Sequence, residues 1–300
     1  MAEGGGSRCE PKPLRGKCGD TVSVRLMSDL HLGASCVDYD LIKEECEDAK
    51  SRNARICING DLLDLTLPKD HKRYVPDALH PSIAGRRDVL NASVKLAVKI
   101  LKPYAHLIDL IGMGNHETAV EKYHAADPIA MVIDELQRHT DHKIFYGGYN
   151  GFIDYRLETV RGKTPRGSRL VIFYHHGGGG SSPVTKGMID FNRLGYVHAD
   201  VKWVGHKHNR FHDHEQSLGC PMDGYKPLLK DVRHIMTGSY MDAYPGQSQE
   251  SIWENGRRSS YAGDGAMRPQ GKGGWRLDIQ LRANDYRLTV NEDVMSKVVA

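Results

Sequence analysis

The sequence predicts an α/β fold in which two β-sheets pack together and helices cover their outer faces. A strand, a helix of about a dozen residues and a second strand follow one another in residues 21–59, which indicates a right-handed βαβ unit with parallel strands. Residues 275–281 and 286–290 alternate apolar and polar side chains and are expected to pair antiparallel as closing strands. No internal repeat or clear linker divides the chain, so we expect one domain over residues 21–300.

The composition is typical of a soluble globular protein. Hydrophobic residues make up 39% of the 300 residues, and no stretch approaches the roughly 18 apolar residues of a membrane helix. Residues 1–20 lack the apolar core of a secretory signal, and the six cysteines include no C-x-x-C pair. These features predict a cytoplasmic protein without a membrane partner. A net charge of +3 is too small to indicate nucleic acid by itself.

The first half of the chain reads as alternating strands and helices. Residues 21–28 and 54–59 are rich in apolar and β-branched side chains and are expected to be strands, with residues 39–50 as the helix between them. Residues 86–101 place apolar side chains on one face and stop before Pro103, which predicts an amphipathic helix. The apolar run 107–113 is the third expected strand.

The second half begins with a predicted helix at residues 128–138, where Asp127 is the expected N-cap and Pro128 the first helical residue. Residues 143–158 carry two Gly-containing turns between short apolar segments, which predicts a hairpin. Three more strands are expected at residues 169–174, 201–204 and 234–240.

Three segments do not fit this regular pattern. Residues 1–20 are rich in Gly, Lys and Pro and are expected to form a flexible arm. Residues 66–87 and 241–274 are expected to be insertions in the domain; the first is basic, and the second contains the basic run 257–272. The cationic side chains of these segments either line a substrate site or are solvated at the surface. The candidate substrate-binding residues are Lys69, Lys72, Arg73, Arg257, Arg258 and Arg268. Aromatic residues interleave with them, as in a surface on which bases stack.

Polar residues follow five of the expected strands directly. The oxygen and nitrogen donors among them are Asp29, His31, Asp61, Asn115, His175 or His176, His206 and His208. Ligands collect where the strands of an open α/β sheet end, so we expect these side chains to meet. Carboxylate, imidazole and amide donors without thiolate suit manganese, iron or zinc. Seven donors exceed one tetrahedral ion, which predicts two divalent ions that share a carboxylate.

The order of these residues resembles the calcineurin-like metallophosphoesterase superfamily. The five matching blocks are Asp29-Leu30-His31, Gly60 to Asp64, Gly114-Asn115-His116-Glu117, His175-His176 and Gly205-His206-Lys207-His208. The resemblance spans residues 22–208. The opening S-D-L-H-L-G is similar to the branch that includes DNA-repair exonuclease subunits and lipid-precursor pyrophosphohydrolases. The resemblance to the superfamily implies its fold, a two-sheet sandwich flanked by helices (αββα).

The resemblance also implies a role for each donor. One ion would be held by Asp29, His31 and His208, the other by Asn115, His175 and His206, with Asp61 between them. We prefer His175 because it lies directly at the end of the apolar strand, and His176 is the alternative because the glycine run 177–180 follows it. His116 would bind no metal, stabilise the phosphoryl charge and protonate the leaving oxygen.

Neighbouring residues have two interpretations each. Asp64 either orients a ligand or caps a turn, and Glu117 either holds the Asn115–His116 loop or is exposed. The glycine run lacks the Lys-Ser/Thr ending of a P-loop, so it is expected to let the backbone approach the site or to let a lid move.

The function expected from the sequence is metal-dependent hydrolysis of a phosphodiester by hydroxide held between two ions, without a covalent enzyme intermediate. A nucleic acid or a nucleotide is the favoured substrate, as for a nuclease. Two alternatives stay open at this point. The chain is a phosphomonoesterase acting on phosphoproteins or small phosphates, or it is a metal-bound scaffold without activity.

Overall fold

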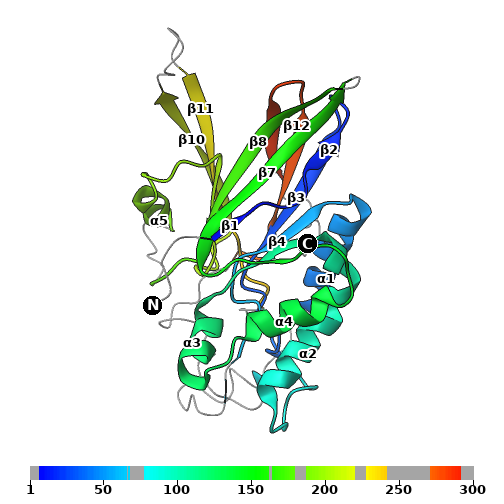
Figure 1. Ribbon diagram of the computed structural model, residues 1–300. Helices are drawn as coiled ribbons and strands as arrows, with labels where there is room; N and C mark the ends of the chain where they lie inside the picture. Colours follow the sequence, from blue (N-terminus) through cyan, green and yellow to red (C-terminus); the bar gives the residue numbers. More distant parts are fainter. Residues whose placement is uncertain are drawn as a thin grey trace, which may run out of the picture.

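Two β-sheets stack face to face, and helices cover their outer sides (Figure 1). The computed structural model describes residues 7–65, 67, 78–161, 164–179, 187–219, 228–241 and 271–291. The helices of this part are α1 (Tyr39–Ser51), α2 (Val89–Leu101), η2 (Lys102–Leu107), α3 (Asn115–His124), α4 (Pro128–Gln137) and α5 (Met188–Arg193). This arrangement confirms the expected α/β fold of two sheets flanked by helices.

The six-stranded sheet contains the predicted βαβ unit. Its strands, in order across the sheet, are β13 (Tyr286–Asn291), β12 (Trp275–Leu281), β3 (Thr21–Met27), β4 (Arg55–Ile58), β5 (Ile108–Ile111) and β6 (Phe145–Tyr146). Strands β3 to β6 run parallel, while β12 pairs antiparallel with both β3 and β13. The parallel unit and the closing pair are therefore both confirmed.

The seven-stranded sheet is built mainly from the second half of the chain. Its strands, in order, are β1 (Ser7–Cys9), β7 (Asn150–Arg161), β8 (Thr164–His175), β9 (Val201–Val204), β11 (Leu228–Met236) and β10 (Phe211–Gly219), with β2 (Leu14–Gly16) also paired with β7. Strand β9 runs parallel to both β8 and β11, so β8 and β9 end at the same edge.

Apolar side chains fill three layers. Val24, Leu26 and Ile172 belong to the core between the sheets, where Trp203 and Trp275 are also buried. The outer face of the six-stranded sheet packs against α1, α2 and α4. On the other side, Phe191 of α5 packs with Phe173 and Met236 on the outer face of the seven-stranded sheet. Burial of both faces makes the strands continuously apolar, as the sequence pattern indicated.

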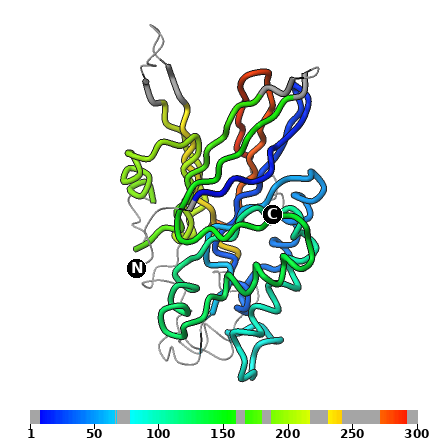
Figure 2. The backbone as a smooth tube through the Cα atoms, viewed as in Figure 1, coloured from blue at the N-terminus to red at the C-terminus, as the bar shows by residue number. Residues whose placement is uncertain are grey.

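The prediction that residues 1–20 form a flexible arm is wrong for residues 7–20, the part that the structure describes. Strands β1 and β2 both pair parallel with β7 (Figure 2, blue beside green). Cys9 and Leu14 are buried, and Arg8 donates to Asp154 of β7 at 2.6 Å. Backbone pairing with a distant strand holds this segment, and its own Gly- and Pro-rich composition carries no sign of that partner.

The predicted hairpin at residues 143–158 is also wrong. Strand β6 joins the six-stranded sheet beside β5, whereas β7 joins the other sheet beside β8. The Gly147-Gly148 turn therefore carries the chain from one sheet to the other. The sequence analysis also did not anticipate η2, α3, α5 and strand β10.

The predicted insertions fall largely outside the described residues. This holds for the candidate substrate residues Lys69, Lys72, Arg73, Arg257, Arg258 and Arg268. Within the described part of the chain, no helix is long and apolar enough to cross a membrane.

Candidate metal centre

The polar residues that follow β3, β4, β5, β8 and β9 meet at one edge of the molecule. The segments after β3 and β4 continue side by side, because the N–H of Asp29 donates to Gly60 O at 3.1 Å and that of His31 to Asp61 O at 3.0 Å. Parallel strands end at the same edge of the sheet, so strand pairing alone brings the first residues after each strand together.

Several of these residues adopt left-handed backbone conformations. The φ angle is +55° at Asp29, +46° at His31, +45° at Asp61, +66° at His206 and +54° at His208. Such conformations are uncommon outside glycine, cost roughly 1–3 kcal/mol each, and gather at functional sites. They turn the chain sharply at the end of each strand and direct the side chain back toward the shared edge.

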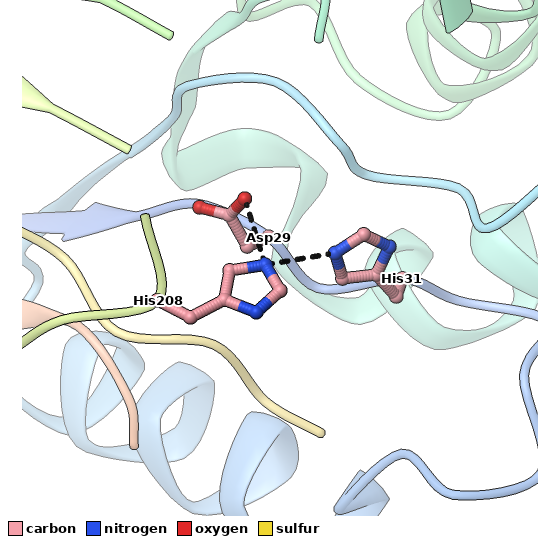
Figure 3. Close-up of side chains that lie close together, drawn as sticks. All are labelled: Asp29, His31 and His208. Carbon is pink, nitrogen blue, oxygen red and sulfur yellow. Dashed lines mark hydrogen bonds and ion pairs between the residues drawn. The ribbon is translucent and has the colours of Figure 1, made fainter. Parts of the chain in front are cut away.

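One group of donors consists of Asp29, His31 and His208 (Figure 3). His208 Nε2 lies 3.4 Å from Asp29 Oδ1 and 3.3 Å from His31 Nε2. Asp29 and His31 are fully buried, and burial lowers the pKa of His31, which keeps its imidazole neutral at pH 7. A neutral imidazole and a buried carboxylate are the forms that bind a divalent ion.

The second group consists of Asp61, His176 and His206, with Asn115 beside it. His176 Nε2 lies 3.2 Å from Asp61 Oδ2 and 3.3 Å from Asn115 Oδ1. On its other side, His176 Nδ1 lies 2.8 Å from the carbonyl oxygen of Asn59. A carbonyl only accepts hydrogen bonds, so Nδ1 carries a proton and the neutral ring presents a lone pair at Nε2.

This tautomer makes the second group fit a cation. Three acceptor atoms meet here, because Asp61 Oδ2 and Asn115 Oδ1 lie 3.2 Å and 3.3 Å from His176 Nε2. Buried acceptors facing one another are costly unless a proton or a metal ion lies between them. The donor set therefore fits a divalent ion, with the carbonyl of Asn59 fixing the ring as carbonyls do for metal-ligating histidines.

Without an ion, a proton takes this place. Burial lowers the pKa of His176, but the Asp61 carboxylate outweighs it and raises the pKa to about 10. Burial and the neighbouring His176 lower the pKa of His206 to about 4. Metal binding must therefore displace a proton from His176, whereas His206 is ready to bind.

The structure places His176 in the centre, and not the preferred His175. The side chain of His175 points to the outer face of the sheet, and its Nδ1 accepts from the N–H of Gly177 at 2.7 Å. Along β8, Leu170, Ile172 and Tyr174 belong to the core between the sheets, and His176 follows them in the same alternation. Val171 and Phe173 are apolar too, so the sequence did not reveal which face was inward.

His116 lies at the start of α3, next to the first group. Its ring centroid is 4.8 Å from that of His31. Its Nδ1 donates to the carbonyl oxygen of Asp64, and its backbone N–H donates to Asp61 Oδ1 at 3.0 Å. Burial lowers the pKa of His116, but Asp61 and Asp64 outweigh it and raise the pKa. With Nδ1 occupied, the proton available for transfer is the one on Nε2.

Glu117 is buried and joins two loops of the centre, so the alternative of an exposed side chain is wrong. Its carboxylate accepts from the N–H groups of Asp61 at 3.1 Å, Leu63 at 2.9 Å and Gly114 at 2.8 Å. Burial, with Asp61, raises the pKa of Glu117 to about 7. The side chain thus fixes the loop after β4 against the start of α3.

Asp64 lies between two rings of the centre. Its Oδ1 is 3.7 Å from His31 Nδ1 and 3.8 Å from His116 Nδ1. Its side chain is buried, and the N–H of Asp64 donates to Leu32 O at 3.0 Å. This position favours the interpretation in which Asp64 orients neighbouring side chains over that of a simple cap.

Two glycines of the motifs are required by close packing. At Gly60, where φ is +76°, a Cβ would lie 2.5 Å from His176 Nδ1. At Gly114 a Cβ would lie 2.0 Å from Asp61 Oδ1. Side chains at these positions would displace the carboxylate and the imidazole, which explains why glycine precedes the donors in both blocks. At Gly177, where φ is +103°, a Cβ would lie 3.0 Å from Gly205 O.

Residues far along the chain support Asp29, and no sequence pattern indicated them. Ser28 Oγ donates to Asp29 Oδ2 and contacts Thr237 Oγ1 at 2.6 Å. The carbonyl of Asp29 accepts from Ser239 Oγ and from the N–H of Tyr240, both at 3.2 Å. Residues 237–240 were expected to continue a strand, but instead they leave β11 and hold the first donor of the centre.

No protein-family model matches the chain, and no curated protein matches its sequence. Among solved structures, a conserved uncharacterized protein of Streptococcus pneumoniae, described as a predicted phosphoesterase, is 13% identical, with a TM-score of 0.31 over 91% of this chain and 99% of that one. A metallophosphoesterase from Sphaerobacter thermophilus is 15% identical, with a TM-score of 0.32 over 90% of this chain and 89% of that one. At these TM-scores neither likeness bears on the chemistry of the site.

Metal uptake is expected to release about one proton per chain at about pH 8, because the pKa of His176 in the metal-free protein is about 10. This pKa lies above the ordinary 6.5, so the stabilisation from the extra proton is complete below pH 6.5 and is lost as pH rises through about 10. Metal affinity should rise over the same range. Titration with Zn²⁺ in weak buffer measures the proton release.

His176→Ala is expected to lose this proton release and one bound ion. His175→Ala, a change at the adjacent residue, should keep both. The opposite result, with the ion lost in His175→Ala alone, would contradict the placement of His176 in the centre.

Proposed function

We propose that the chain is a metal-dependent hydrolase of phosphoesters, with a phosphodiester as its substrate. The observation that carries this proposal is the convergence of His176 Nε2, Asp61 Oδ2 and Asn115 Oδ1 next to the group of Asp29, His31 and His208. A two-metal phosphoesterase requires two adjacent sets of acceptor atoms without thiolate, and a histidine ring beside them that can donate a proton. The order of the motif blocks supports the same class.

The proposed ligands divide into two sets with one shared member. Asp29, His31 and His208 would hold one ion, and Asn115, His176 and His206 the other, with Asp61 shared. When bound, two divalent ions activate water and neutralise the phosphoryl oxygens of an in-line displacement. Manganese, iron and zinc all match this donor set.

The chain's own residues then have three tasks. His116 holds a proton on Nε2, with Nδ1 anchored on Asp64 O, and delivers it to the leaving oxygen. The N-terminus of α3, where Asn115 and His116 lie, favours negative charge on the substrate. Glu117 holds the loop that contains Asp61 against the start of α3 by accepting hydrogen bonds from both.

The proposal is tested by hydrolysis of bis(p-nitrophenyl) phosphate and p-nitrophenyl phosphate after complete removal of metal by a chelator and restoration with Mn²⁺, Fe²⁺ or Zn²⁺. We expect no turnover in chelator, recovery with metal, and higher kcat/KM for the diester. Turnover that persists in excess chelator would contradict the proposed function. Preference for the monoester would replace the diesterase by a phosphomonoesterase, and metal binding without turnover of either ester would identify a scaffold.

A further inference from the structure

A series of hydrogen bonds joins the core between the two sheets to Asp29, a proposed metal ligand. Trp203 Nε1 donates to Thr237 Oγ1 at 3.1 Å, and Thr237 Oγ1 lies 2.6 Å from Ser28 Oγ. Ser28 Oγ in turn donates to Asp29 Oδ2. All four residues are fully buried. We refer to them as the hydrogen-bond chain of Asp29.

The hydrogen-bond chain connects three strands from the two sheets. Trp203 belongs to β9 and Thr237 follows β11 in the seven-stranded sheet, whereas Ser28 follows β3 in the six-stranded sheet. The indole of Trp203 is packed in the core between the sheets, so its N–H has a fixed position. At Gly205 a Cβ would lie 2.8 Å from Ser28 Oγ, so only glycine allows this close approach.

Residue chemistry fixes the direction of each hydrogen bond in the chain. An indole N–H only donates, and an ionised carboxylate only accepts. Ser28 gives its one hydroxyl proton to Asp29, so Ser28 Oγ must accept from Thr237, and Thr237 accepts from Trp203. The carbonyl of Val204 is another acceptor for Thr237, but it is farther away, at 3.4 Å. Every bond of the chain therefore points toward the carboxylate, and bonds in series strengthen one another.

The hydrogen-bond chain also decides which oxygen of Asp29 can bind an ion. Each carboxylate oxygen has two lone pairs. Oδ2 accepts from Ser28 Oγ and from the N–H of His206 at 3.0 Å, which fills both of its acceptor sites. Oδ1 shares the N–H of His206 at 3.1 Å and lies 3.4 Å from His208 Nε2 (Figure 3). The remaining acceptor site is therefore on Oδ1, the oxygen beside the other donors of the first group.

We propose that Trp203, Thr237 and Ser28 are positioning residues that hold the Asp29 carboxylate with Oδ1 directed toward its ion. Their hydrogen bonds keep the carboxylate ordered before metal binds, so binding does not have to pay for ordering it. This inference deepens the proposed function and rests on it, because it concerns the ion assigned to Asp29, His31 and His208.

The first test is the affinity of the full chain for Zn²⁺ after removal of metal, measured by calorimetry. Thr237→Val keeps the shape of the side chain and removes its hydroxyl. We expect it to raise the Kd of one of the two ions about 10–100-fold, the loss typical for a residue that orients a metal ligand. Thr237→Ser keeps the hydroxyl and should retain the starting Kd. An unchanged Kd in Thr237→Val would overturn the proposal.

The matched control for this test is Thr159→Val, which removes another buried hydroxyl. Thr159 lies in β7 beside Gly16 of β2, at the opposite end of the strand from Asn150, which pairs with His175. This variant should retain both Zn²⁺ affinities. A rise in Kd in Thr159→Val as large as that in Thr237→Val would show a general effect of losing a buried hydroxyl and would overturn the proposal.

A second test asks whether Thr237 acts on Asp29 through Ser28. Ser28→Ala, which makes the smallest change in the hydrogen-bond chain, should raise the same Kd about 10–100-fold. The double variant Ser28→Ala/Thr237→Val should lose no more affinity than the more affected single variant, because both changes interrupt one series of bonds. Losses that multiply in the double variant would mean that the two residues act independently, which would overturn the proposal.

These affinities need no turnover, so the positioning role and the proposed function can fail separately. Zn²⁺ affinities that change as expected in a chain that hydrolyses neither phosphoester would support the positioning role and contradict the proposed function. Metal-dependent hydrolysis with an unchanged Kd in both single variants would overturn the positioning role and leave the proposed function standing. A chain that binds neither Zn²⁺ nor Mn²⁺ would overturn both.

Discussion

His116→Ala is expected to lower kcat for a phosphodiester by about 10²–10⁴-fold, the usual contribution of a positioned proton donor. The bound metal should remain, because His116 belongs to neither proposed ligand set. The structure supports this role through the anchored Nδ1 on Asp64 O, the raised pKa and the position at the start of α3. The measurement is kcat in the metal-loaded enzyme, together with metal content by atomic emission.

The control for this prediction is His124→Ala. His124 is the last residue of the same helix and lies outside the centre, so its replacement should leave kcat within about twofold of the starting value. A fully active His116→Ala enzyme with normal metal content would show that another group protonates the leaving oxygen, or that the leaving group needs no proton.

Asp61→Asn is expected to reduce activity by about 10³-fold or more and to lower the metal content, since it removes the one charge shared by the two proposed ion sites. In the unmodified protein the backbone N–H of His116 donates to Asp61 Oδ1 at 3.0 Å. Asparagine has the same size and keeps an oxygen that can accept this hydrogen bond. The fold should therefore be retained, as circular dichroism would show. Metal stoichiometry and kcat/KM are the readouts.

Asp127→Asn is the matched control for Asp61→Asn. Asp127 caps α4 by accepting from the N–H of Ala130 at 2.9 Å, and asparagine caps helices equally well. This variant should bind two ions and retain its activity. If Asp61→Asn also binds two ions and turns over the substrate normally, Asp61 does not connect the two sites.

The regular elements could be predicted from the sequence because local patterns determine them. The predicted strands at residues 201–204 and 275–281 match β9 and β12 from first to last residue, and Asp127 caps α4 as expected. The polar residues after the parallel strands could be expected to meet because parallel strands end at one edge. Asp29, His31 and His208 lie together for this reason, as do Asp61, Asn115 and His206 with His176.

The missed features depend on partners distant in sequence. The Gly- and Pro-rich segment of β1 and β2 becomes extended through pairing with β7, more than 130 residues away. The turn at Gly147-Gly148 was recognised locally, but only the assembled sheets decide that β6 and β7 separate. Helix α3 begins inside a motif interpreted as a loop, where Glu117 satisfies the N–H groups of both Gly114 and Asp61.

The sequence by itself determined the class of donor atoms and the strand ends that carry them, because residue type fixes ligand chemistry and periodicity fixes where a strand stops. Only the tertiary structure decided between His175 and His176. Both faces of β8 are apolar, one against the other sheet and one against α5, so the inward face cannot be identified from alternation alone. The packing of the two sheets directs His176 toward Asp61 and leaves His175 on the outer face of the seven-stranded sheet.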